Sequence, residues 1–164
     1  MELKNVTIST DGACSCNPGP GGYAAIIRFT KKDGTDEVRE IAGYDERTTN
    51  NKMELKAVIE AIAKLKKPCF IKVRTDSMVV CNAIAELDAA HDNGWKKKTG
   101  GRRANIELLQ QLYDLKKGSK LIDADGNNIG EHKLIYEHVK GHNGDPDNER
   151  CDQLARAQIA LNAG

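Results

Sequence analysis

The segment Lys140–Ala157 reads K-G-H-N-G-D-P-D-N-E-R-C-D-Q-L-A-R-A and holds the residues that bear most directly on the chemistry of the chain. His142 stands between Gly141 and Gly144, a composition typical of a loop. Asp152 lies one turn inside an alanine-rich stretch that has the character of a helix. A lone carboxylate is poorly placed in a helix that packs against a core, unless something binds it.

Other acidic residues stand at comparable positions. Asp11 follows V-T-I-S-T and Asp76 follows F-I-K-V-R-T, so each is expected at the end of an apolar strand, and Glu54 is expected beside the apolar stripe of a helix. Taken singly, each acid also fits an ordinary turn, helix-boundary or first-turn role. Brought together with Asp152, the carboxylates would repel one another, so a shared site is favourable only around divalent cations. The pattern therefore points to metal-ion catalysis.

Hydrophobic periodicity predicts the secondary structure. Alternating apolar residues indicate a strand at residues 4–10, and two further strands are expected at 23–30 and 37–44, separated by turn residues. Residues 70–75 are expected to form a short buried strand, and 133–138 a last strand. A helical period and capping residues indicate helices that start at Thr49 or Asn50 and end before Pro68, that follow Ser77 through Leu87, and that span 106–116 and 147 to about 162. Strands and helices of these lengths are ordinary for a compact domain.

The order of these elements predicts the architecture. Three consecutive strands favour an antiparallel meander, and the following strand–helix passages favour an α/β fold with a mixed five-stranded sheet covered by helices. The glycine-rich segment Asn17–Gly22 lacks the G-K-[ST] of a phosphate loop and is expected to be a tight connection between the first strands. Residues 1–164 are expected to form a single domain.

Composition excludes several other classes of protein. No apolar run is long enough to span a membrane, and the N-terminus lacks a signal-peptide pattern, so a cytoplasmic protein with no membrane partner is expected. Five cysteines without C-x-x-C spacing favour reduced thiols over a disulfide framework or a zinc site. A net charge of +1 means that any attraction to nucleic-acid phosphate must be local. A monomer is expected.

The motifs occur in an informative order: T-D-G at Thr10–Gly12, N-P-G-P-G-G-Y at Asn17–Tyr23, T-T-N-N-K-M-E-L at Thr48–Leu55, T-D-S at Thr75–Ser77, and then Lys140–Ala157. Together they resemble ribonuclease H of type 1, the family that cuts the RNA strand of an RNA–DNA hybrid. The resemblance covers essentially the whole chain and implies a ribonuclease-H-like fold. It also implies endonucleolytic hydrolysis that leaves 5′-phosphate and 3′-hydroxyl ends, with an RNA–DNA hybrid as the partner.

The resemblance assigns roles to the acidic residues. Asp11 is expected to bridge two Mg²⁺ ions, Glu54 and Asp76 to complete one site, and Asp152 to serve the other. Oxygen ligands suit Mg²⁺, and Mn²⁺ can substitute. His142 is expected to shuttle a proton or to assist departure of the product.

The resemblance also implies contacts to the hybrid. Candidates for the groove are Asn17, Asn50, Asn51 and Met78; candidates for a phosphate pocket of the DNA strand are Arg47, Thr49 and Asn105; candidates for a basic protrusion are Trp95, Lys96, Lys97 and Lys98, with Arg102 and Arg103 nearby. Such a basic segment provides local attraction to phosphate, although a solvated charged loop is its common alternative. Asn50 or Asn51 can instead cap the first helix.

Two other functions stay open on the sequence. A DNA nuclease of the same superfold, such as an integrase or a junction resolvase, would share the acidic cluster, but the N-P-G-P-G-G and T-T-N-N-K-M-E-L motifs and the basic segment argue against it. A non-catalytic hybrid-binding module would be expected to have lost a carboxylate, and all four acids are present. The sequence leaves open whether the chain is free-standing or once belonged to a larger polymerase or coat-gene product, although its ends favour the first.

Overall fold

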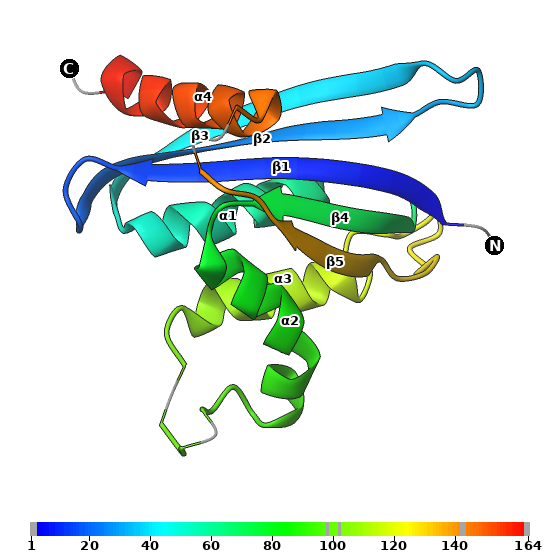
Figure 1. Ribbon diagram of the computed structural model, residues 1–164. Coiled ribbons are helices and arrows are strands. Elements are labelled where there is room, and N and C mark those ends of the chain that lie inside the picture. The colour runs from blue at the N-terminus through cyan, green and yellow to red at the C-terminus, as the bar shows by residue number, and fades with distance from the viewer. Residues whose placement is uncertain (1–2, 98, 102, 142–143, 163–164) are drawn as a thin grey trace.

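A computed structural model describes residues 3–97, 99–101, 103–141 and 144–162 (Figure 1). Its sheet has the strand order β3-β2-β1-β4-β5. The antiparallel meander consists of β1 (Lys4–Cys14), β2 (Gly19–Thr30) and β3 (Asp36–Thr48), and β4 (Cys69–Thr75) and β5 (Lys133–His138) extend it in parallel from β1. The predicted α/β fold with one mixed five-stranded sheet in a single domain is confirmed.

Helices cover both faces of the sheet unequally (Figure 1). On one face lie α1 (Asn50–Ala63), α2 (Met78–Asp92) and α3 (Ile106–Lys116), and they enclose the main apolar core with β1 and β4. On the other face α4 (Pro146–Asn162) packs through Cys151 and Ala155 onto Ala24 and Ile26 of β2. None of the helices in the described ranges is long and apolar enough to cross a membrane.

The start of α1 is fixed by two side chains, one next to the helix and one from the connection between β1 and β2. The N-cap is Thr49, whose hydroxyl accepts a hydrogen bond from the Lys52 backbone at 3.2 Å. Asn17 adds a second acceptor, since its Oδ1 lies 3.1 Å from the Asn50 nitrogen. The alternative in which Asn50 or Asn51 caps the helix is wrong, because both residues already lie inside it.

Glycines allow β1 and β2 to continue past their expected ends. The sequence predicts that the first strand ends at Asp11, but β1 runs on to Cys14 because Gly12 lets it pass close to α1. Likewise, the sequence predicts a connection at Asn17–Gly22, but Gly19 already starts β2. A Cβ at Gly22 would meet the Ala155 carbonyl oxygen, so only glycine lets α4 lie directly on this strand.

The strand β4 is buried on one face only, which corrects the expectation of a fully buried strand. Ile71 and Val73 are fully buried, whereas the alternating Phe70 is 37 % exposed and Lys72 is also exposed. The cause is the position of α4, which contacts β1, β2 and β3 and leaves this face of β4 uncovered.

Candidate active site

Three carboxylates meet at one edge of the sheet, one from β1, one from α1 and one from the residue that follows β4. The parallel pairing of β1 with β4 sets Ser9 opposite Arg74, so Asp11 and Asp76, each two residues further on, lie side by side. Glu54 comes from the first turns of α1. One oxygen of each of the acids Asp11, Glu54 and Asp76 lies within 4.8 Å of the others.

Close contact between β1 and α1 brings Glu54 to this edge. A Cβ at Gly12 would lie 2.6 Å from the backbone nitrogen of Glu54, so any side chain at residue 12 would push the helix away. The oxygen Oε2 of Glu54 is buried and has no hydrogen-bond partner among the described residues. A buried acceptor without a partner is costly, and a bound cation would satisfy it.

The crowded carboxylates alter one another's ionisation. Burial, and after it the charge of Asp76, raises the pKa of Asp11 to about 7. Burial, and after it the charges of Asp11 and Asp76, raises the pKa of Glu54 to about 9. A hydrogen bond of 3.0 Å from the Gly12 nitrogen to Asp11 acts in the opposite direction but is outweighed. Without a cation, the fold therefore stores electrostatic repulsion at this edge.

The fourth predicted carboxylate, Asp152, lines the same pocket but stands apart from the group of three. The pocket has a volume of 610 Å³, and its walls include Asp11, Glu54 and Asp76. The charge of Asp152 contributes to the raised pKa of Asp11, so the two acids are electrostatic neighbours. Asp152 nevertheless pairs with Arg156 on the same helix, with Nε and Oδ1 3.1 Å apart.

The sequence motifs assign no role to Arg156, yet it also lines the acidic pocket, and its side chain is 67 % exposed. The spacing of four residues in D-Q-L-A-R is the signal that could have found it, because residues at that spacing are neighbours on a helix.

The donor set fits hard divalent cations. Its ligands are carboxylate oxygens alone, they are grouped tightly enough to share an ion, and their mutual repulsion would be relieved by positive charge. Zinc sites more often include nitrogen or sulfur ligands, and the nearby Cys14 instead points its thiol at the backbone carbonyl of Cys16, 2.6 Å away. Oxygen-only coordination favours Mg²⁺ or Mn²⁺.

The predicted groove contacts surround this pocket to different degrees. Asn50 lines it, and Asn17, in the exposed connection before β2, is tied to the Asn50 backbone. Asn51 is exposed on the first turn of α1, and Met78, the first residue of α2, is 53 % exposed. All four residues are therefore exposed, either beside the acidic pocket or at the start of a nearby helix.

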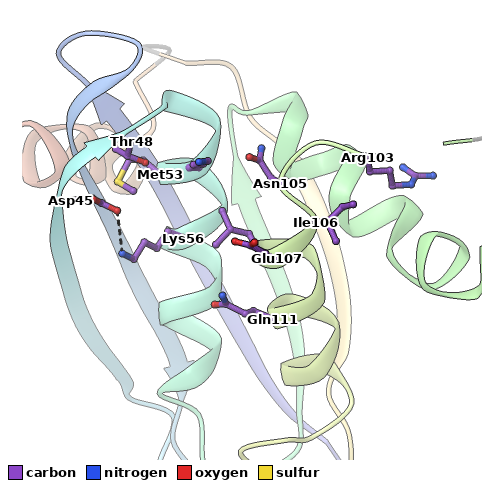
Figure 2. A pocket seen from close by; sticks show the side chains of 11 residues that line it. Asp45, Thr48, Met53, Lys56, Arg103, Asn105, Ile106, Glu107 and Gln111 are labelled. Carbon is purple, nitrogen blue, oxygen red and sulfur yellow. Dashed lines mark ion pairs between the residues drawn. The ribbon is translucent and has the colours of Figure 1, made fainter. Parts of the chain in front are cut away.

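A second pocket, of 650 Å³, lies between α1 and the start of α3 (Figure 2). Asn105 lines it with a backbone in the left-handed region (φ 59°) and makes no capping hydrogen bond through its side chain. Lys52, Lys56 and Arg103 also line it, and Lys56 pairs with Asp45 at 3.7 Å. The sequence does not single out the cations of α1, because their helix positions look like an ordinary solvated face.

The other residues expected at the phosphate pocket lie at its margin. Arg47 is exposed near the end of β3, and Thr49 is occupied as the N-cap of α1. Neither is among the residues that line the pocket of Asn105.

The basic segment follows α2. Trp95 is half-buried and packs edge-on against His91 and Tyr113, with ring centroids 5.8 and 6.0 Å apart. Lys96 and Lys97 are exposed, and the Lys97 nitrogen donates a hydrogen bond to the Gly101 carbonyl oxygen at 2.6 Å. The assignment of Trp95 as a substrate contact stays a prediction, because much of its ring is used in packing.

Three residues of the predicted site lie outside the described residues. Lys98 and Arg102, from the basic segment, and His142, the proposed proton shuttle, fall in the gaps between the described ranges. Their roles therefore rest on the sequence.

Comparison with known proteins agrees with this geometry. The family model described as RNase H matches residues 3–160. A "Ribonuclease H" of Nitratidesulfovibrio vulgaris is 44 % identical over 165 residues, covering 98 % of this chain and 92 % of that protein. Another, of Escherichia coli O9:H4, is 44 % identical over 156 residues, covering 94 % of this chain and 89 % of that protein. The chain belongs to the ribonuclease H family.

Solved structures show the same fold at lower sequence identity. LC9-RNase H1, described as a type 1 RNase H with the type 2 active-site motif, superposes with a TM-score of 0.78 at 24 % identity, covering 98 % of this chain and 74 % of that one. LC11-RNase H1, solved in complex with an RNA/DNA hybrid, gives a TM-score of 0.65 at 22 % identity, covering 97 % and 99 %. The predicted membership of the ribonuclease H family and the predicted fold are thus confirmed.

Proposed function

We propose that this chain hydrolyses the RNA strand of RNA–DNA hybrids endonucleolytically and leaves 5′-phosphate and 3′-hydroxyl ends. The observation that carries the proposal is the group Asp11, Glu54 and Asp76, whose oxygens lie within 4.8 Å of one another in a member of the ribonuclease H family. A related structure holds an RNA/DNA hybrid, which supports that substrate class.

The acids would hold two divalent cations. Asp11, Glu54 and Asp76 would hold one of them, and Asp11 together with Asp152 would hold the other. Bound Mg²⁺, or Mn²⁺ in its place, would make hydroxide available near neutral pH and neutralise charge that develops on the phosphate. Two observations support this use of the site: Oε2 of Glu54 has no hydrogen-bond partner among the described residues, and the pKa values of Asp11 and Glu54 are raised.

Substrate selection falls to residues around the two pockets. Asn17, Asn50 and Asn51 would hydrogen-bond to the 2′-hydroxyls that separate RNA from DNA. This role is supported by the position of Asn50 on the wall of the acidic pocket and by the hydrogen bond from its backbone to Asn17. The side chain of Asn105 makes no capping hydrogen bond among the described residues, and lysine and arginine side chains line the same pocket. This arrangement suits a phosphate of the DNA strand. The lysines at 96–98 add sequence-independent attraction.

The role of His142 and the quaternary state complete the proposal. His142 would move a proton or help the product leave, a role that the family pattern K-G-H-N-G supports. The protein would act as a monomer in the cytoplasm. All four acids come from one chain, so the site needs no second copy.

The test compares substrates of one sequence. End-labelled RNA–DNA hybrid, duplex RNA and duplex DNA are incubated with the protein, with Mg²⁺ and with chelator. We expect cuts only in the RNA of the hybrid, only with Mg²⁺, and 5′-phosphate ends on the downstream products. Cleavage of duplex DNA at a comparable rate, or of hybrid in chelator, would contradict the proposal.

A further inference from the structure

Asp152 pairs with the side chain of Arg156 and does not belong to the close group of the other three acids. It lines the acidic pocket with them, yet only Asp11, Glu54 and Asp76 form the close group of oxygens among the described residues. Its Oδ1 accepts a hydrogen bond from Arg156 Nε at 3.1 Å, and Arg156 lines the same pocket. Arg156 therefore places positive charge beside the carboxylate that is proposed to hold the second cation.

We propose that Arg156 is a positioning residue that exchanges partners: it pairs with Asp152 until a divalent cation takes that carboxylate, and then turns its guanidinium to a phosphate of the bound RNA strand. The inference rests on the proposed function, since it assumes that Asp152 receives a cation. It adds a role for a residue outside the acidic group.

The pair is weak enough to be exchanged. It is an i, i+4 pair on one helix, and the side chain of Arg156 is 67 % exposed while that of Asp152 is 22 % exposed. Exposed pairs of this kind change an equilibrium by only about 1.4- to 5-fold. A divalent cation held by several carboxylates can displace such a partner, whereas a buried bidentate pair would resist.

The released arginine is suited to bind phosphate. A guanidinium presents a planar set of donors that matches phosphate oxygens, and its charge does not depend on pH in the working range. Arg156 stands on the pocket wall beside Ile159 and Ala160, in the same pocket as Ser15 and Asn50, of which Asn50 is proposed to contact RNA.

The same helix offers a matched control. Arg150 lies on α4 as well, but its Nε pairs with Glu40 of β3 at 2.8 Å, and it is not among the residues that line the acidic pocket. Arg150→Gln removes the same charge from the same helix without touching Asp152. Arg156→Lys keeps the charge and tests whether charge alone suffices.

The first experiment measures Mg²⁺ binding to the full chain by calorimetry, without nucleic acid. We expect Arg156→Gln to tighten Mg²⁺ binding about two- to five-fold, Arg156→Lys to resemble the wild type, and Arg150→Gln to have little effect. In an Asp152→Asn background, Arg156→Gln should no longer tighten binding, because the carboxylate for which the arginine competes is gone.

The second experiment measures steady-state cleavage of a hybrid at saturating Mg²⁺. We expect Arg156→Gln to raise KM several-fold with little change in kcat, the opposite direction to its effect on the metal, and Arg156→Lys to restore KM in part. Unchanged or weaker Mg²⁺ binding in Arg156→Gln, or equal tightening in Arg150→Gln, would overturn the inference. Absence of Mg²⁺ binding by the wild type would instead overturn the proposed function.

Discussion

Asp11 and Glu54 lie across the β1–α1 contact with their carboxylates in one close group, and after burial the charge of Asp11 is the largest cause that raises the pKa of Glu54 to about 9. The relationship exists only because Gly12 lets the strand and the helix backbones approach so closely. Function is thus favoured at the expense of the stability of the metal-free fold.

Asp11→Asn should therefore stabilise the metal-free protein. In the unfolded chain Asp11 has its ordinary pKa of 3.8, whereas in the folded chain its pKa is about 7. The folded state therefore binds the proton more tightly, and the stability that this proton contributes at low pH is lost as pH rises through about 7. With chelator we expect the variant to gain about 1–3 kcal/mol at pH 8 and little at pH 4. Urea unfolding at both pH values, with the exposed Asp125→Asn as control, measures this; a variant less stable than the wild type at pH 8 would contradict it.

Asp145 should be important for stability because it performs two tasks at the start of α4. Its Oδ2 pairs with Arg74 Nη2 at 2.5 Å, and its Oδ1 accepts a hydrogen bond from the Asn148 nitrogen at 3.0 Å. We expect Asp145→Ala to cost about 1–3 kcal/mol, while Asp145→Asn, which keeps a cap, costs less. Chemical denaturation of both variants tests the order, and equal losses would show that the cap contributes nothing.

His132 should weaken the fold in acid. The residue is only 3 % exposed, its Nδ1 accepts a hydrogen bond from the Cys69 nitrogen at 3.1 Å, and burial lowers its pKa. In acid, His132 binds a proton more readily in the unfolded chain than in the folded chain. The free energy of unfolding therefore decreases as pH falls below about 6.5. His132→Asn keeps an acceptor without titrating, so we expect a flatter thermal stability profile between about pH 7 and 5; an unchanged profile would show that His132 titrates freely.

The basic segment should contribute affinity without specificity. Replacing Lys96, Lys97 and Lys98 with alanine is expected to weaken hybrid binding and to reduce its salt dependence, by up to about one unit of slope for each phosphate that is no longer neutralised. Turnover at saturating substrate should change less. Fluorescence anisotropy over a range of salt concentrations measures the slope, and a slope equal to that of the wild type would identify these lysines as a solvated loop.

The local patterns of the chain predict most of the fold. The apolar stripe of α1 is set by neighbours a few residues away, so its period and its capping residue identify the helix. The extension of β1 beyond Asp11 could not be predicted, because it depends on how closely α1 approaches Gly12. The exposure of one face of β4 likewise could not be predicted, because it depends on which strands α4 packs against.

For the site as well, the sequence identifies some residues and only the structure shows the others. The order of motifs identifies the acids, and the structure brings Asp11, Glu54 and Asp76 together from distant parts of the chain. Long-range pairs such as Arg74 with Asp145 leave no periodic signal and are visible only in the structure. Arg156 could have been found from its spacing to Asp152, whereas the burial of Trp95 against Tyr113 could not.

If Asp11, Glu54 and Asp76 perform the cleavage of RNA, Asp76→Asn should lose that activity. Its single-turnover rate of hybrid cleavage is measured at saturating enzyme and Mg²⁺, with hybrid affinity measured in parallel. Asp76 lies outside β4 and is partly exposed, so the substitution should leave the fold intact. We expect cleavage to fall by at least about 10³-fold with hybrid binding retained, since a ligand of the catalytic cations is removed. Cleavage within a few-fold of the wild-type rate would contradict the account.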